Sequence, residues 1–279
     1  FGSGAEYAEF VDLNKLGAVV TKGVANVPWP GNPTPRVAEV YGGMLNAVGL
    51  QNPGIDLFVE RDIPFLKQFD TKIMVNVCGH STEEYIEVVE RLRDQPVDLL
   101  EINISCPNVK EGGIAFGQDP KAVEAITKEM KKHAAQPVIM KLSPNVTDIT
   151  EMARAAEAGG ADGLSLINTI TGMKIDINRQ KFVLANKTGG MSGPAIHPVA
   201  VRMVYQTAQA VRLPIVGMGG IMNAEDAIEM ILAGATAVSV GTANFTNPHV
   251  TEEIVAGIRD YMERYQVADI RDLVGAVHE

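Results

Sequence analysis

Lysine, asparagine and cysteine side chains follow the expected β-strands of this sequence at nearly every strand end. The stretch NISCPNVKEGGIAFGQ (103–118) places the thiol of Cys106 just past the buried apolar run 97–104 and before a glycine-bearing loop. Each such residue alone has an ordinary explanation as a solvated or turn-forming side chain. Their recurrence at successive strand ends favours a functional site. Its candidate members are Lys22, Asn76, Asn103, Cys106, Lys141, Asn168, Thr169, Gly219, Gly220, Gly241 and Thr242.

The chemistry of these side chains indicates a flat, polar, anionic ligand. An asparagine offers a donor and an acceptor together, which matches an imide or a uracil-like ring. Lys22 or Lys141 could hold a carboxylate or stabilise negative charge on a reduced flavin. The Gly219-Gly220 and Gly241-Thr242 pairs are typical of phosphate-binding loops. Without a carboxylate cluster or an HxH motif at the strand ends, we expect no metal.

The thiol of Cys106 has three interpretations: a core side chain, a nucleophile or a proton-transfer group. Core cysteines are the commonest class, but a position between Ser105 and Pro107 at a strand end does not suit a core. A nucleophile needs a histidine partner, and the five histidines supply no obvious one. A base is the better interpretation. Cys78 lacks comparable polar neighbours, and we interpret it as a core residue.

Short β-branched runs alternate with helical patterns along the chain, which indicates a parallel sheet buried on both faces. Helix starts are marked by Ser81 with Glu84, by Asp119-Pro120 and by Asn223. Seven strands are expected, whereas a (β/α)8 TIM barrel has eight. We therefore predict a barrel that lacks its first N-terminal strand in this chain, with a doubly wound sheet as the alternative. The seven expected strands are 18–21, 73–77, 97–104, 137–142, 163–167, 214–218 and 236–240.

Composition limits the class of protein. The 279 residues are 46% hydrophobic and show no linker, so one domain over 1–279 is expected. The net charge of −10 disfavours nucleic-acid and anionic-membrane surfaces, and two cysteines exclude a disulfide framework. We expect a cytoplasmic protein. Residues 170–194 form an excursion with a predicted hairpin, either decorative or a rim over the site or a subunit contact.

Several long motifs resemble the catalytic subunit of class 1B dihydroorotate dehydrogenases. The resemblance runs from Phe1 to about Thr251, and Cys106 separates the chain from class 2 relatives, which use serine there. It implies a TIM barrel that binds FMN and oxidises (S)-dihydroorotate to orotate in pyrimidine biosynthesis. The motifs are NISCPNVKEGGIAFGQDP, GNPTPRVAEVYGGMLNAVGLQNPG, KLSPNVTDI, LINTITG, GMGGI and VGTANF.

The resemblance also assigns roles by position. Cys106 would be the base that takes the C5 proton while a hydride passes to flavin N5. Substrate contacts would be Lys22, Asn46, Ala47, Val48, Gly49, Leu50, Asn103, Asn168 and Thr169. FMN contacts would be Lys22, Gly23, Asn76, Asn103, Lys141, Ile167, Gly193, Gly219, Gly220, Gly241 and Thr242.

The resemblance implies partners as well. A separate subunit carrying FAD and [2Fe–2S] would pass electrons to NAD, in a heterotetramer built on a homodimer of catalytic subunits. Three alternatives remain: a flavin barrel acting on another pyrimidine, a flavin-free isomerase or aldolase using the phosphate site, and a non-catalytic binding subunit.

Overall fold

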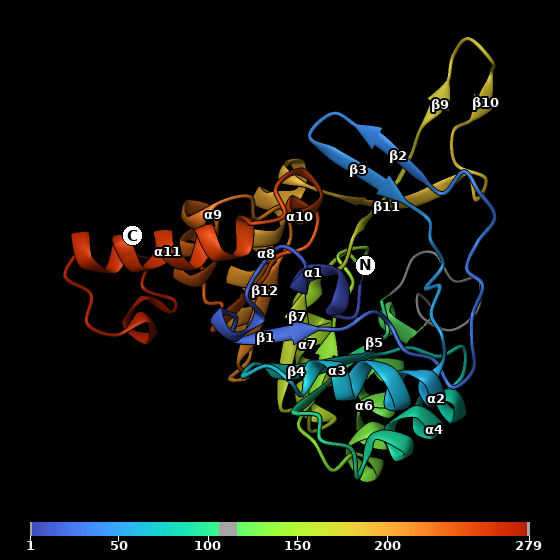
Figure 1. The fold of residues 1–279 in the computed structure, drawn as a ribbon, viewed down its shortest axis with the longest axis horizontal. Coiled ribbons are helices and arrows are strands. Elements are labelled where there is room, and N and C mark those ends of the chain that lie inside the picture. Colours follow the sequence, from blue (N-terminus) through green and yellow to red (C-terminus); the bar gives the residue numbers. More distant parts are fainter. Residues whose placement is uncertain (1, 106–115, 278–279) are drawn as a thin grey trace.

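A seven-stranded parallel sheet forms the centre of the protein. The computed structural model describes residues 2–105 and 116–277. The strands lie side by side in chain order, and the sheet curls as a partial barrel (Figure 1). This confirms the predicted fold class and all seven expected strands; the eighth strand, expected before residue 1, stays a prediction. The strands are β1 (Ala18–Val20), β4 (Lys72–Val77), β5 (Leu99–Asn103), β6 (Val138–Lys141), β7 (Gly163–Leu166), β12 (Ile215–Met218) and β13 (Ala237–Ser239).

Helices connect successive strands and cover the outer face of the sheet. Three helix starts are capped as predicted: Ser81 accepts a hydrogen bond from the Glu84 amide, Asp119 from the Lys121 amide and Asn223 from the Asp226 amide. These bonds satisfy amides that a helix leaves free at its first turn. The long helices are α4 (Thr82–Leu92), α6 (Pro120–His133), α7 (Ile149–Ala158), α8 (His197–Ala210), α9 (Ala224–Leu232) and α11 (Val250–Arg264).

Short helical segments complete the helical part of the fold. They are α1 (Ala5–Ala8), η1 (Leu13–Lys15), α2 (Ile55–Leu57), η2 (Phe58–Asp62), α3 (Ile63–Leu66), η3 (Pro194–Ile196), α10 (Ala243–Thr246) and η4 (Ile270–Leu273). One hydrophobic core, with Tyr85, Leu100 and Ile102 among its fully buried members, lies between the sheet and its helices. None of the helices in the described ranges is long and apolar enough to cross a membrane.

Two antiparallel sheets stand beyond the carboxyl ends of the parallel strands. A four-stranded sheet has the order β2-β3-β11-β8, and β9 pairs with β10 as a hairpin that projects past it (Figure 1). The sequence predicted the hairpin but not the pairing of β3 with β11, which joins segments far apart in the chain. Their bounds are β2 (Val37–Val40), β3 (Gly43–Asn46), β8 (Ile170–Met173), β9 (Ile175–Asp176), β10 (Lys181–Phe182) and β11 (Thr188–Ser192).

Candidate active site at the carboxyl ends of the strands

A buried carboxylate, Glu101, organises the first part of the site. Its side chain is fully buried, and its Oε2 lies 3.2 Å from Lys141 Nζ and also accepts a hydrogen bond from Asn76 Nδ2. Ser165 Oγ donates to Glu101 Oε1 over 2.6 Å. A buried carboxylate needs such partners, because an unpaired charge away from water is very costly. Four adjacent strands therefore meet at one side chain.

Three amides continue this network toward the strand ends. Asn103 Nδ2 donates to Asn76 Oδ1 at 3.3 Å, and Asn168 Nδ2 lies 3.3 Å from Asn103 Oδ1. Asn168 Nδ2 also lies 2.7 Å from Ser105 Oγ. The Tyr85 hydroxyl donates to the backbone carbonyl of Asn103 at 2.7 Å, which fixes the end of β5. The three amides are thus held in one connected set.

Strand geometry explains why these residues meet. Residues 101, 103 and 105 alternate with the apolar Leu100, Ile102 and Ile104, so they share one face of the strand. The parallel register then pairs Asn103 with Lys141 and Glu101 with Asn76. A polar stripe along β5 is therefore aligned with polar residues of both neighbouring strands.

The segment 46–50 lies next to the same hydrogen-bond network, and Gly23 lies close to both. A Cβ on Gly23 would lie 3.0 Å from Asn76 Oδ1 and 3.1 Å from a methyl carbon of Leu50. The buried side chain of Asn52 accepts from the Ala25 amide at 3.1 Å and donates to the Leu50 carbonyl at 2.7 Å. Gly23 thus permits a close approach, and Asn52 joins the Lys22–Ala25 stretch to the segment 46–50.

The four-stranded antiparallel sheet closes another side of the site. Asn46 Nδ2 lies 3.5 Å from the Gly190 carbonyl, and a Cβ on Gly190 would overlap Thr169 Oγ1 at 1.9 Å. The Thr169 amide donates to Asn168 Oδ1 at 2.8 Å. Asn46 and Thr169 therefore approach one another across Gly190, above the amide network.

Glycines form the part of the site that follows β12 and β13. Gly219 has φ +128° and Gly220 has φ +70°, a region that favours glycine. A Cβ on Gly219 would lie 3.3 Å from Ile167, and one on Gly220 would lie 2.8 Å from the Gly193 carbonyl. Thr242 Oγ1 donates to Ser192 Oγ at 2.7 Å, beside Gly193. The two glycine pairs therefore converge on residues 192–193.

Comparison with known proteins decides the family. The family model for dihydroorotate dehydrogenase matches residues 1–262. The chain belongs to the dihydroorotate dehydrogenase family.

Individual members of this dihydroorotate dehydrogenase family are similar over nearly the whole chain. The protein named "Dihydroorotate dehydrogenase B (NAD(+)), catalytic subunit" from Lachnoclostridium phytofermentans is 73% identical over 99% of this chain and 92% of its own length. Proteins of the same name from Alkaliphilus metalliredigens and Alkaliphilus oremlandii are 64% and 63% identical, over 99% of this chain and 92% and 91% of their own lengths. The resemblance read from the sequence motifs is therefore confirmed at the level of the family.

The structure brings together the predicted residues of this dehydrogenase site that it describes, at one end of the sheet. Cys106 lies outside the described residues, so its role stays a prediction. Cys78 is fully buried in the core, as interpreted from the sequence. The contacts and bonds above involve Gly23, Asn46, Leu50, Asn76, Asn103, Lys141, Ile167, Asn168, Thr169, Gly193, Gly219, Gly220 and Thr242, and the chain places Lys22, Ala47, Val48, Gly49 and Gly241 beside them in sequence.

Sequence reasoning missed Glu101, Ser165 and Asn52. The sequence predicted a site built from lysines and amides, but the carboxylate of Glu101 lies at its base as the ion-pair partner of Lys141. A signal was present, because Glu101 is a charged residue inside the otherwise apolar run VDLLEINI, two residues before Asn103. Ser165 and Asn52 carried no such signal, since small polar residues are common in strands and turns.

The donor set fits a flavin phosphate ester. The Lys141 ammonium has three N–H groups, of which the described residues engage one through Glu101, so donors remain for a ring oxygen or nitrogen. Gly219 and Gly220 expose backbone without side chains, and a Cβ on Gly241 would meet nothing within 4 Å. Lysine and amides on one side and bare backbone on the other suit a polar ring joined to a phosphate. FMN has this chemistry.

Proposed function

We propose that this chain is the catalytic subunit of an NAD-linked dihydroorotate dehydrogenase, which oxidises (S)-dihydroorotate to orotate in pyrimidine biosynthesis. The observation that carries the proposal is the connected amide set Asn76, Asn103 and Asn168 beside Lys141 at the strand ends. The printed names of the similar proteins support the substrate and the NAD link.

FMN, when bound, would supply the ring that accepts a hydride from the substrate. We assign Lys141, Asn76 and Asn103 to the polar edge of that ring, because one connected hydrogen-bond network holds the ammonium and the two amides at the strand ends. Gly193, Gly219, Gly220, Gly241 and Thr242 are assigned to its phosphate, where backbone can approach closely. Gly23 and Ile167 pack beside these groups. Lys22 is assigned to both ligands.

Substrate recognition is assigned to the residues that surround the amide network. Asn103 and Asn168 can each donate and accept, so together they match the amide edges of a dihydropyrimidine ring. Lys22 pairs with the substrate carboxylate. Thr169 and the backbone of Asn46, Ala47, Val48, Gly49 and Leu50 enclose the ring from the side of the four-stranded sheet.

Cys106 is assigned as the base that removes the C5 proton. A thiol of ordinary pKa near 8.5 has enough thiolate near neutrality to act without a partner base, whereas a serine hydroxyl does not. Ser105 is held by Asn103 and Asn168, so the residue before the thiol is anchored in the described network.

The remaining assignments concern the partner subunits and the cellular location. The name "catalytic subunit" of the similar proteins implies a second subunit, and we propose that it carries FAD and [2Fe–2S] in a heterotetramer built on a catalytic homodimer. Such a cluster is held by four ligands, mostly cysteines, and this chain has two cysteines. A cytoplasmic location, and no nucleic-acid or membrane ligand, stay predictions from composition.

The proposal is tested by anaerobic reduction. The purified chain is loaded with FMN, mixed with (S)-dihydroorotate, and followed at the visible flavin band. Bleaching is expected, and Cys106→Ala should slow it at least a hundredfold while orotate affinity changes little. A chain that holds FMN but is not bleached would contradict the proposed substrate. Cys106→Ala reduced at the normal rate would remove the thiol from the mechanism.

A flavin barrel acting on an uncharged pyrimidine is the second candidate, because the amide set would also match uracil or thymine. Lys22→Ala separates the two. The proposed function predicts that this variant loses dihydroorotate turnover selectively, since only that substrate has a carboxylate. Equal loss with an uncharged dihydropyrimidine would favour the second candidate.

A further inference from the structure

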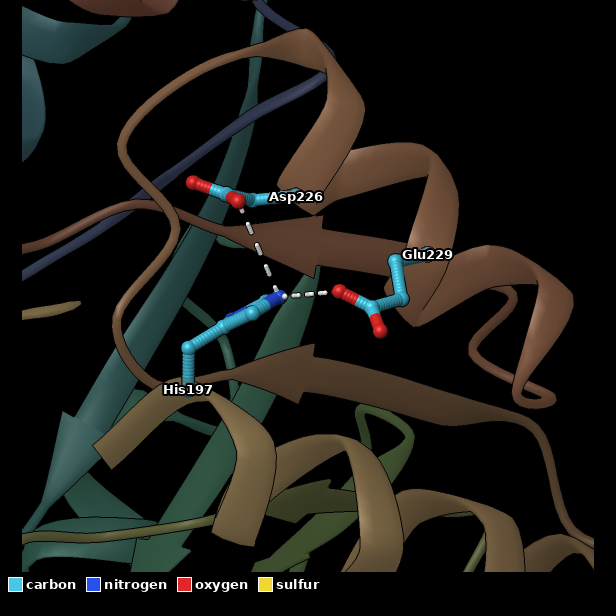
Figure 2. Close-up of side chains that lie close together, drawn as sticks. All are labelled: His197, Asp226 and Glu229. Atoms are coloured by element: carbon cyan, nitrogen blue, oxygen red, sulfur yellow. Dashed lines mark hydrogen bonds and ion pairs between the residues drawn. The ribbon is translucent and has the colours of Figure 1, made fainter. Parts of the chain in front are cut away.

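A second cluster of chemically active side chains lies outside the strand-end site. His197 is the first residue of α8, and Asp226 and Glu229 stand three residues apart on α9. Figure 2 shows the three side chains pointing toward one another between these helices. His197 Nε2 lies 3.1 Å from Glu229 Oε2 and 4.0 Å from Asp226 Oδ1. One ligand atom from each residue can be chosen so that all lie within 4.8 Å of one another.

A hydrogen bond to a backbone carbonyl fixes the orientation of the His197 ring. Its Nδ1 lies 2.9 Å from the Gly219 carbonyl oxygen, which can only accept, so Nδ1 carries the proton of that hydrogen bond. In the neutral ring Nε2 then has a lone pair, and this lone pair faces the Glu229 carboxylate. The Nε2 lone pair and the Glu229 carboxylate repel one another unless a cation, either a proton or a metal ion, lies between them. A histidine held by a carbonyl in this way is the usual arrangement of a metal ligand.

Each of the two carboxylates also keeps an oxygen available for an ion. Asp226 Oδ2 accepts the Met222 amide at 2.8 Å, which leaves Oδ1, the oxygen nearer the ring, available. Glu229 keeps 60% of its side chain exposed, whereas His197 keeps 10%. The cluster is therefore buried on the histidine side and open on the glutamate side, which gives an ion an entry path and leaves room for water ligands.

We propose that His197, Asp226 and Glu229 bind a divalent transition-metal ion of the zinc class, through one nitrogen and two carboxylate oxygens. Two donors that each lie about 2.0–2.1 Å from zinc are about 3.1–3.4 Å apart at near-tetrahedral angles. The 3.1 Å between His197 Nε2 and Glu229 Oε2 already meets this value, and Asp226 Oδ1, at 4.0 Å, has to approach Nε2 by less than about 1 Å. The two carboxylates, whose ligand atoms lie within 4.8 Å of each other, have to approach by at most about 1.5 Å. Nitrogen and oxygen donors together favour zinc, cobalt or nickel over calcium or magnesium.

The site would tie three parts of the fold together. His197 contacts the Gly219 carbonyl within the glycine pair that follows β12, and α9 begins shortly after that pair. A bound ion would therefore hold α8, this turn and α9 in one arrangement. The expectation of no metal rested on the residues at the strand ends and on the absence of a cysteine motif with metal-ligand spacing. His197 and the pair Asp226 and Glu229 are far apart in sequence and match no ligand spacing there.

Isothermal titration of the full 279-residue chain with ZnCl₂ tests the proposal. About one equivalent should bind, and His197→Ala, Asp226→Asn and Glu229→Gln should each weaken binding at least tenfold. Glu90→Gln is the matched control, because Glu90 pairs with His133 on the surface without a third ligand. Cys106→Ser should retain the equivalent, which excludes binding at the Cys106 thiol.

A thermal measurement supports the titration. Zinc at a hundred times its dissociation constant for the unchanged chain should raise the melting temperature of the chain and of Glu90→Gln clearly more than that of Glu229→Gln. Glu229→Gln changes an exposed side chain and keeps its shape, so loss of folding would not explain a negative result. Absence of stoichiometric binding, or equal binding in all three ligand variants, would overturn the proposal and leave the cluster as an ion pair around a protonated His197.

Discussion

The amino and carboxyl ends of the parallel strands differ in their side-chain hydrogen bonds. At the amino ends the same bond recurs: a polar residue just before one strand accepts from a backbone amide of the neighbouring strand. Asp98 immediately precedes β5 and accepts the Ile73 amide of β4 at 2.9 Å. Asp162 precedes β7 and accepts the Val138 amide of β6 at 2.7 Å. Thr236 precedes β13 and accepts the Ile215 amide of β12 at 3.1 Å.

At the carboxyl ends no such repeat exists among the described residues. β5 ends in a stripe of acidic and amide side chains, β6 ends in Lys141, and β12 is followed by two glycines with positive φ. The amino-end carboxylates of Asp98 and Asp162 remain 28% and 38% exposed, whereas Glu101 is fully buried. The repeated hydrogen bonds at the amino ends join neighbouring strands of the sheet. The carboxyl ends differ from strand to strand and carry buried polar groups that cost stability.

The largest effect is expected at Glu101. Glu101→Ala should lower the free energy of unfolding by about 3–5 kcal/mol, because the largely buried ammonium of Lys141 and the buried hydroxyl of Ser165 lose their partner. Urea unfolding measures this. Glu124→Gln, which breaks an exposed helical ion pair with Lys128, is the control and should cost less than about 1 kcal/mol. Similar losses in the two variants would mean that burial does not distinguish this site.

The next effect is expected at Gly220. Gly220→Ala should cost about 2 kcal/mol and weaken FMN retention at least tenfold, because φ is +70° and the Cβ would lie 2.8 Å from the Gly193 carbonyl. Gly241→Ala is the matched control for the unfolding free energy alone, because open space surrounds its Cβ but the residue is itself assigned to the phosphate. Unfolding and flavin fluorescence measure the two quantities. If Gly241→Ala were equally damaging, steric crowding would not be the reason.

A smaller effect is expected at the amino ends. Asp98→Ala should cost about 1–2 kcal/mol at pH 7, since the buried Ile73 amide loses its acceptor. FMN and orotate binding should stay within twofold of the unchanged chain, because Asp98 lies at the opposite end of the strands. A clear loss of orotate affinity would break the distinction between the two ends.

The same residue gives a pH dependence. Burial acts to raise the pKa of Asp98, but the Ile73 amide and Lys72 outweigh it and hold that pKa below its usual value. A lowered folded-state pKa stabilises the fold above the unfolded-state value, and this contribution is lost as the pH falls through the folded-state pKa. The stability difference between the unchanged chain and Asp98→Ala should therefore shrink below about pH 4. A constant difference from pH 7 to pH 2 would contradict this.

The sequence by itself determined the local parts of this protein. Buried strands are short β-branched runs, and caps such as Ser81 and Asn223 act within four residues, so both can be read from neighbouring letters. Strand ends could also be located, and the candidate residues at those ends were expected to be neighbours because parallel strands place their carboxyl ends at one edge of a sheet.

Only the tertiary structure decided which side chains share a hydrogen bond. Glu101 meets Lys141 and Ser165 from strands 40 and 64 residues further along the chain, through a register that no local pattern encodes. The pairing of β3 with β11, which brings Asn46 to Gly190, spans 144 residues. His197 likewise reaches Glu229 only because α8 and α9 flank the same strand. Sequence patterns report propensity and periodicity, whereas these contacts depend on how distant elements pack.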